Sequence, residues 1–263
     1  MLDTFASSFT ALFLAALGIS VAIRIWLASR QIRHVCASRD RVPAEFADRV
    51  ALEAHRKAAD YTVAKVRFGF VALAVETALL LVLTLGGGID ALANWWQARW
   101  PELTAGLGLI FSLLLVSGAV DLPLAWWRQF AIEARFGFNR MTPRLFLTDI
   151  LKSALLAAVI GAPVILAVLW LMGTMGSYWW LHVWLFWCCF NLLILFIYPT
   201  WIAPLFNKFE PLAEGEVRQR VEALLARCGF HSGGLFVMDG SRRSAHGNAY
   251  FTGFGKAKRI VFF

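Results

Sequence analysis

The sequence predicts an all-α polytopic membrane protein with five spans, followed by the start of a small α+β domain on the cytoplasmic side. Three observations lead to this fold class. Hydrophobic residues make up 59% of the 263 residues and charged residues only 16%, whereas soluble domains have about 45–50% and about 25%. Five apolar segments are long enough to cross a bilayer. Beyond residue 204 the apolar runs give way to a mixed composition.

The five spans follow from segment length, because a helix needs about 20 mostly apolar residues to cross the hydrocarbon core. Segments of this kind are predicted at residues 5–28, 68–89, 103–125, 146–173 and 178–203. Tryptophan and tyrosine lie near several of their ends, as is typical of membrane interfaces. We therefore expect a transmembrane region at residues 1–204 and a cytoplasmic domain at 205–263.

The orientation follows from the basic residues between the spans. Lysine and arginine number 9 in residues 29–67, 1 in 90–102, 4 in 126–145 and 9 in 205–263. The positive-inside rule then puts the N-terminus outside and the C-terminal domain in the cytoplasm, in a bacterial inner membrane or an equivalent one. The excess of 25 basic over 17 acidic residues reflects this topology, so we expect membrane lipid and no nucleic acid as a partner.

Some ionisable side chains lie inside predicted spans, where an isolated charge costs at least ~2.5 kcal/mol. Asp149 and Lys152 are one helical turn apart, so we expect them to pair with each other. Glu76 has no such neighbour in its own helix. It either makes a hydrogen bond between helices or serves as a functional group in an aqueous chamber, and the sequence leaves both interpretations open.

The segments outside the spans carry weaker patterns. Residues 44–67 are predicted to form an amphipathic surface helix that runs into the second span. In the tail, apolar residues recur on one face of a helix from Val217 to Cys228, which Gly229 ends. Short strands are predicted at 235–238, 248–254 and 259–263, with a turn at Asp239 and Gly240.

The last strand has no turn signal after it and would leave an uncovered hydrophobic edge. Residues 205–263 are also too few to bury an independent core. We expect the chain to stop partway through its cytoplasmic domain. The alternative is that the tail completes its core against the membrane helices or a second chain.

Motifs for metal or nucleophilic catalysis are absent from the sequence. There is no H-E-x-x-H, G-x-S-x-G or P-loop pattern, and no cysteine and histidine cluster has zinc-ligand spacing. The five histidines are scattered along the chain, at positions 34, 55, 182, 231 and 246. We therefore predict no catalytic residue and no metal ligand within this chain.

Four segments, at 53–62, 136–142, 202–209 and 243–254, together resemble a known family. They are EAHRKAADYT, FGFNRMT, IAPLFNKF and RSAHGNAYFTGF. Their order and sequence resemble the CAAX prenyl protease type 1 family of integral-membrane zinc metalloproteases, and four matches in register are more specific than any one of them.

The resemblance implies a seven-span helical barrel around a central chamber, of which this chain has five spans. It also implies zinc as the cofactor and cleavage of peptide bonds near prenylated C-termini or in membrane-associated peptides. The family's H-E-x-x-H helix and its distant glutamate ligand lie beyond the last strand of this sequence. The resemblance therefore implies that the chain alone is inactive and that its partners are a peptide or lipidated-peptide substrate.

The candidate substrate-binding residues are Asn248, Ala249, Tyr250 and Phe251. The pattern alone predicts an ordinary half-buried strand, whereas the resemblance implies an edge strand to which an extended substrate adds through main-chain hydrogen bonds. Small Ala249 would leave room for the approaching main chain, and the Asn248 amide would hold a peptide carbonyl.

Two further interpretations stay open at this stage. The adjacent Arg242 and Arg243 either attract a substrate carboxylate or belong to a solvated turn. A non-enzymatic protein is the alternative to the protease, either a scaffold for hydrophobic or lipidated partners or a transporter-like bundle with Glu76, Asp121 and Asp149 as its polar path. The metal content of the purified full-length protein distinguishes a zinc protease from a scaffold or a transporter.

Overall fold

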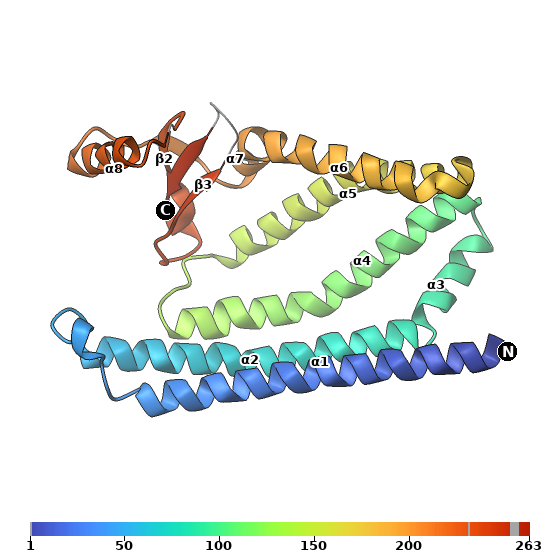
Figure 1. Cartoon of the computed structure of the whole chain (residues 1–263), viewed down its shortest axis with the longest axis horizontal. Helices are drawn as coiled ribbons and strands as arrows, with labels where there is room; N and C mark the ends of the chain where they lie inside the picture. Colours follow the sequence, from blue (N-terminus) through green and yellow to red (C-terminus); the bar gives the residue numbers. More distant parts are fainter. Residues whose placement is uncertain (1, 231, 253–257) are drawn as a thin grey trace. The chain divides into compact units, whose positions relative to one another are not determined.

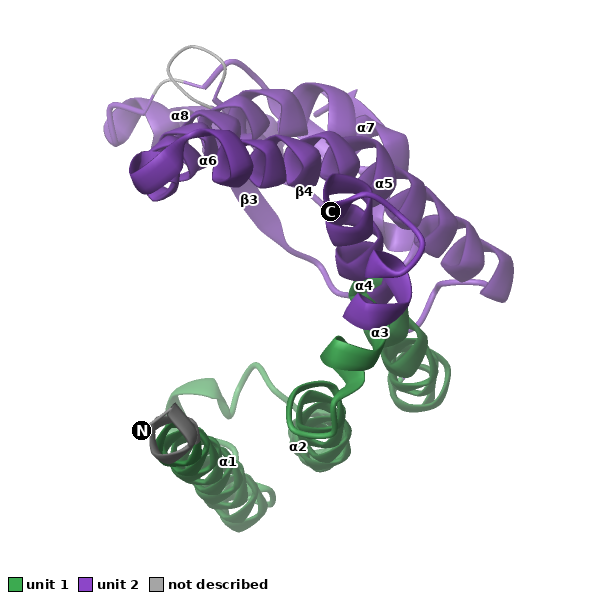
Figure 2. Ribbon diagram, turned by 90° about the vertical axis from the view of Figure 1, so that its right-hand side faces the viewer, with its two compact units in different colours: residues 1–92, 113–136 green, residues 93–112, 137–263 purple. Residues whose placement is uncertain are grey.

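The computed structural model describes residues 2–230, 232–252 and 258–263. The chain divides into two compact units, one of residues 1–92 and 113–136 and the other of residues 93–112 and 137–263 (Figure 2). In the described part, five helices are long and apolar enough to cross a membrane: Ser7–Ser38, Leu52–Thr84, Glu102–Glu133, Pro143–Thr174 and Gly176–Phe206. The five predicted spans are confirmed, and each helix is longer than its predicted span.

The first unit contains helices α1 (Leu2–Ser38) and α2 (Leu52–Thr84), which lie side by side (Figure 1). The predicted amphipathic helix at 44–67 is wrong in its first part. Residues Ala44–Phe46 form a separate 3₁₀ turn after Pro43, and the continuous helix begins only at Leu52. Its remaining residues run without a break into the second span, as expected.

The third and fourth spans contain α4 (Glu102–Trp127) and α5 (Pro143–Thr174). The start of α5 follows from its local sequence. Helix α5 begins where the Thr142 hydroxyl accepts a hydrogen bond from the Leu145 amide at 3.2 Å, with Pro143 next to this cap. Threonine at the N-cap and proline at the first helical position both favour a helix start. Helix α6 (Trp179–Ile197) lies beside α5 in the second unit.

The short helix α3 (Gly88–Gln97) was not predicted from the sequence. Its Trp96 indole donates a hydrogen bond to the Ser112 hydroxyl of α4 at 2.9 Å. The indole also covers Gly108, where an added Cβ would come within 2.5 Å of the ring. The missing side chain of Gly108 is therefore what lets Trp96 approach α4.

Two spans end in π-helical turns, which are rare in proteins. Helix α4 continues into Arg128–Glu133, and α6 continues into Tyr198–Ile202 and then into α7 (Ala203–Phe206). The first segment extends its span beyond the predicted end at residue 125, whereas the second lies within the predicted fifth span, which only α7 extends. The second leads the chain directly into the C-terminal sheet.

The C-terminal segment contains a four-stranded sheet and helix α8 (Glu216–Arg227). Its strands are β1 (Phe209–Pro211), β2 (Leu235–Met238), β3 (Ala249–Thr252) and β4 (Arg259–Phe262). The strand order is β1-β2-β4-β3, in which β2 and β4 are parallel and the other pairs antiparallel. Val261 of the central strand β4 is only 1% exposed and lies at the centre of this sheet.

The strand predictions are confirmed within their central residues. Strand β2 has the predicted bounds, β4 ends one residue early, and β3 begins one residue late. Residues 253 and 254 of the predicted second strand lie outside the described residues. Strand β1 was not predicted, and a 3₁₀ turn at Asp239–Arg242 replaces the predicted two-residue turn. The division of the chain at residue 204 stays a prediction.

Candidate functional site

Within the described part of the chain, strand β3 lies at an edge of the sheet, because β4 is its only neighbour in the strand order. The main chains of Asn248 and Phe263 exchange two hydrogen bonds, at 2.8 and 2.9 Å, at the start of this pairing. Hydrogen-bonded and non-hydrogen-bonded pairs alternate along an antiparallel ladder. The main-chain groups of Tyr250 therefore face β4, whereas those of Ala249 and Phe251 face the open edge.

The four candidate substrate-binding residues are consecutive on this edge. The side-chain oxygen of Asn248 accepts a hydrogen bond from the Ala249 amide at 2.8 Å, so it covers the first outward-facing donor. The Nδ2 group of the same amide takes no part in this contact. Phe251 is 74% exposed, which leaves a large apolar side chain beside the open main-chain groups.

Tyr250 contacts the end of β4. Its ring lies 6.1 Å from the ring of Phe263 in an edge-on arrangement. Burial raises the pKa of Tyr250, and the neighbouring Tyr198 raises it further. The phenol therefore stays protonated at neutral pH and is available as a hydrogen-bond donor.

The segment before β3 is held by the residues that precede α5. Asn139 and Ser244 form an isolated antiparallel bridge, the Ala245 amide donates to the Phe138 carbonyl at 3.0 Å, and the Phe138 ring stacks on His246 with 4.1 Å between centroids. Two of the four family-like segments thus contact each other. This contact could not be predicted from the sequence, because about a hundred residues lie between the partners.

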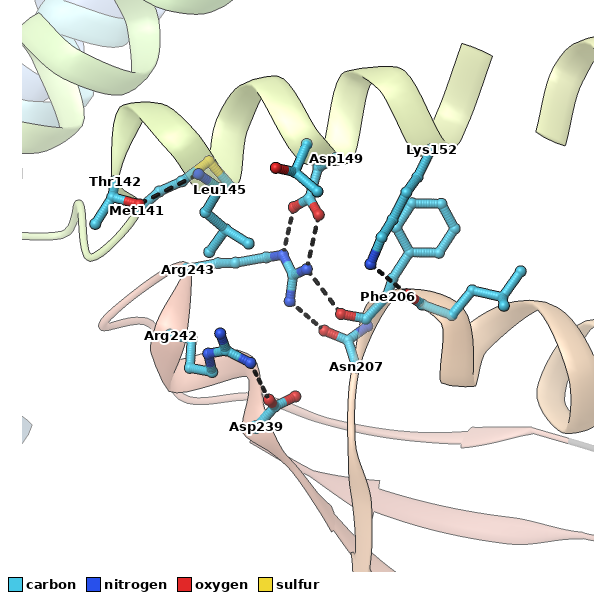
Figure 3. A network of polar contacts seen from close by, with 12 residues as sticks. Met141, Thr142, Leu145, Asp149, Lys152, Phe206, Asn207, Asp239, Arg242 and Arg243 are labelled. Atoms are coloured by element: carbon cyan, nitrogen blue, oxygen red, sulfur yellow. Dashed lines mark hydrogen bonds and ion pairs between the residues drawn. The ribbon is translucent and has the colours of Figure 1, made fainter. Parts of the chain in front are cut away.

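Arg243 is the centre of a polar network shown in Figure 3. Its guanidinium donates from Nε and Nη2 to the two carboxylate oxygens of Asp149 at 2.8 and 3.0 Å. It also donates from Nη1 to the Asn207 side-chain oxygen at 2.6 Å and from Nη2 to the Phe206 carbonyl at 2.7 Å. The hydrogen bonds to Asp149 raise the pKa of Arg243 above its ordinary value, so its charge is permanent.

The predicted pairing of Asp149 with Lys152 is wrong. Asp149 bonds to Arg243, and Lys152 donates from Nζ to the Leu205 carbonyl at 3.0 Å (Figure 3). Both side chains thus bond to groups far away in sequence. A bidentate guanidinium is a better partner for a carboxylate than a lysine one turn away, because two parallel hydrogen bonds accompany the charge attraction.

Arg242 has a different environment from that of Arg243. It is 59% exposed and pairs with Asp239 at 3.3 Å. Asp239 also accepts a hydrogen bond from the Lys208 amide at 2.8 Å. Burial by itself would raise the pKa of Asp239, but the Lys208 amide and Arg242 outweigh it and lower the pKa below its ordinary value. Of the two arginines, therefore, only Arg242 lies at the surface.

The segment at 53–62 forms the first turns of α2, in the first unit, and contacts the end of α1 and the residues that follow it. The contacts that join the two helix ends are Arg39 with Asp60, Arg56 with Asp40, and His55 with the Ser38 carbonyl. The next residue, Tyr61, donates to Glu133 at 2.7 Å. This segment therefore has a structural role in the geometry described.

Comparison with known proteins decides the family. Residues 31–208 match the family model described as CAAX prenyl protease N-terminal, five membrane helices, and residues 211–263 match that of peptidase family M48. This chain belongs to the CAAX prenyl protease family. It is similar to a crystal structure of S. mikatae Ste24p, with a TM-score of 0.85 and 32% identity over 96% of this chain and 60% of that chain.

Curated CAAX proteases give the same result. The human protein named CAAX prenyl protease 1 homolog is 34% identical over 96% of this chain and 55% of its own length. The protein named CAAX prenyl protease 1 from Saccharomyces cerevisiae is 34% identical over 86% of this chain and 52% of its own length. The chain thus spans about half the length of these relatives. It is an integral membrane protein with five apolar helices.

The CAAX protease family implies a metal, commonly zinc, but the described residues do not fit one. Among residues 2–230, 232–252 and 258–263, no group of three histidine, cysteine, aspartate or glutamate side chains could hold a metal ion. Three of the histidines are engaged elsewhere, since His55 and His182 contact main-chain carbonyls and His246 stacks on Phe138. His231 lies outside the described residues.

Proposed function

We propose that this chain forms the membrane frame and the substrate-binding edge of a CAAX-type membrane metallopeptidase. The observation that carries the proposal is the open edge of β3 beside an exposed Phe251. An extended peptide pairs there with the outward Ala249 carbonyl and the outward main-chain groups of Phe251, as in other recognition by strand addition. Family membership supports a peptide as the ligand.

The substrate in this proposal is a membrane-associated or prenylated peptide, cleaved near its C-terminus. The side chains of β3 orient it: Asn248 donates from its amide to a peptide carbonyl, and small Ala249 allows close approach. Because no group of three metal-ligating side chains lies among the described residues, we expect the 263-residue chain by itself to be inactive.

The proposed orientation has the N-terminus outside and residues 205–263 in the cytoplasm. The relatives named above are eukaryotic and give no support to a bacterial membrane, so the proposal concerns only the side of the membrane. Cys228 is exposed. In sealed, right-side-out membranes it should react with a membrane-impermeant thiol reagent only after the membrane is opened.

Strand addition is tested by N-methylation of a substrate peptide, one main-chain amide at a time, with the intact protein from its membrane. An added strand directs alternate amides at its partner, so affinity should fall at every second position. A uniform effect, or none, would contradict strand addition. A protein that also lacks bound zinc would then support the scaffold or transporter-like alternative.

Asn248→Ala tests the role assigned to that side chain. Loss of one neutral hydrogen bond to the substrate should lower peptide turnover about three- to tenfold, while zinc content stays unchanged. The matched control is Ser241→Ala, at an exposed position in the turn before the site. Unchanged turnover in Asn248→Ala would show that the substrate assignment is wrong.

A further inference from the structure

The chain leading into β3 is held at one half-buried arginine, Arg243. Arg243 makes four side-chain hydrogen bonds, to Asp149, Asn207 and the Phe206 carbonyl (Figure 3). The side chains of Arg243 and Asp149 are only 20% and 17% exposed. Such a pair is less screened by water than a surface ion pair and holds its geometry more strictly.

The main chain of Arg243 is held as well. Its amide donates to the Gly240 carbonyl at 2.9 Å, and its carbonyl accepts from the Arg140 amide at 3.2 Å. Arg243 therefore links Asp149 of α5 to the end of α7 and the residue after it. Its main chain also links the turn after β2 to the segment before α5. Asn248, where the pairing with β4 begins, follows five residues later.

The partner residues on α5 lie on one face of the helix. Asp149 and Lys152 are three residues apart and bond to Arg243 and to the Leu205 carbonyl respectively. The first contact attaches the segment before β3 to α5, and the second attaches α7 to α5. Specific hydrogen bonds thus hold the residues on both sides of the sheet against this helix.

We propose that Arg243 is a positioning residue for the substrate edge. By bonding to Asp149, Asn207 and Phe206, it fixes the segment Ser244–Gly247 and thereby the place of the outward main-chain groups of β3. The inference rests on the proposed function for its account of what binds at that edge. Arg242 has no such role, because it is exposed and its ion pair, with Asp239, lies within its own turn.

The test compares Arg243→Gln, Arg243→Lys and the matched control Arg242→Gln in the intact protein. The two glutamine variants lose the same charge one residue apart. Amide hydrogen exchange is measured first without peptide, with α8 (Glu216–Arg227) as the internal reference. Peptide KM and kcat are then measured separately for each variant.

We expect Arg243→Gln to speed exchange at Ala249–Thr252 about tenfold and to leave α8 unchanged. Its KM should rise more than its kcat falls, since the edge is displaced and the reacting groups are not. Arg243→Lys keeps the charge but lacks the two-pronged donor, so it should restore the wild-type values only in part. Arg242→Gln should match the wild type.

Two outcomes would overturn the inference. Exchange in Arg243→Gln equal to that in Arg242→Gln would show that the network does not hold β3. Equal loss of protection in β3 and α8 would show a general loss of stability in place of positioning. Failure of the proposed function is separate, because it is detected in the wild type by the N-methylated peptides.

Discussion

The membrane helices and the C-terminal sheet are held together in different ways. In the middle of the spans, polar side chains such as Thr77 and Asn191 bond to their own helix: Thr77 donates to the Leu73 carbonyl, and Asn191 donates to the Trp187 carbonyl. In the sheet region, Arg243 and Asp239 bond to residues some 30 to 95 positions away. A span is therefore specified by its own residues, whereas the sheet is specified by distant contacts.

The physical reason lies in the surroundings of each region. A helix satisfies all its main-chain groups within one segment, which is what a lipid environment requires. A strand of four residues satisfies none of its main-chain hydrogen-bonding groups by itself, so it is stable only within a sheet. Substitutions of equal chemistry should consequently have different effects in the two regions, and those that break distant contacts should have the largest.

The largest effect is expected for Val261→Asp at the centre of the sheet. Val261 is 1% exposed, and a buried unpaired carboxylate there should destabilise the sheet by at least about 3 kcal/mol. Limited proteolysis of residues 209–262 should become faster while the helical circular dichroism signal persists.

The matched control for this prediction is Val237→Asp in the adjacent strand β2. Val237 is 39% exposed and pairs with Phe262, next to Val261. Its new carboxylate stays in water, so the change in stability should be below about 1 kcal/mol. Equal effects of the two variants would contradict a core centred on β4.

A smaller effect is expected for Gly108→Ala in α4. The added methyl group would meet the Trp96 ring at 2.5 Å, so the helices must separate, at a cost of about 1–3 kcal/mol. Thermal unfolding in detergent, followed by tryptophan fluorescence, measures this. Gly118→Ala in the same helix is the control, because nothing lies within 4 Å of its new Cβ and alanine favours the helix.

The smallest effect concerns acid stability at Asp239. Its pKa is lowered in the folded protein, so its carboxylate stabilises the fold above the ordinary aspartate pKa of about 3.9. This contribution is lost as the pH falls through the lowered pKa. Asp239→Asn should be less stable than the wild type at neutral pH, with a difference that shrinks in acid.

Much of the fold was predictable because its signals are local. The spans follow from runs of apolar residues, helix α8 follows from its periodicity, and the start of α5 follows from Thr142 and Pro143. Short helix α3 and strand β1 were missed. Neither has a distinct pattern of its own, and each is stabilised by a neighbour, Trp96 against α4 and Phe209 against Met238.

The candidate site divides in the same way. The sequence and its family resemblance predicted Asn248, Ala249, Tyr250 and Phe251 as one strand, and their part in substrate binding stays a prediction. The support behind that strand was not predicted. The sequence predicted Lys152 as the partner of Asp149. Only the folded chain brings Arg243 to Asp149 and Asn207 to Arg243.

The sequence by itself determined five membrane helices, their family and the strand that carries the candidate site, because each depends on residues close together in the chain. Tertiary structure decided that β3, an ordinary strand by its residue pattern, lies at an edge, and that Arg243, unlike Arg242, is half-buried in a network. An edge is defined by which strands pair with which, and a half-buried ion pair by the approach of distant segments. Both are properties of the whole arrangement and of no single stretch of sequence.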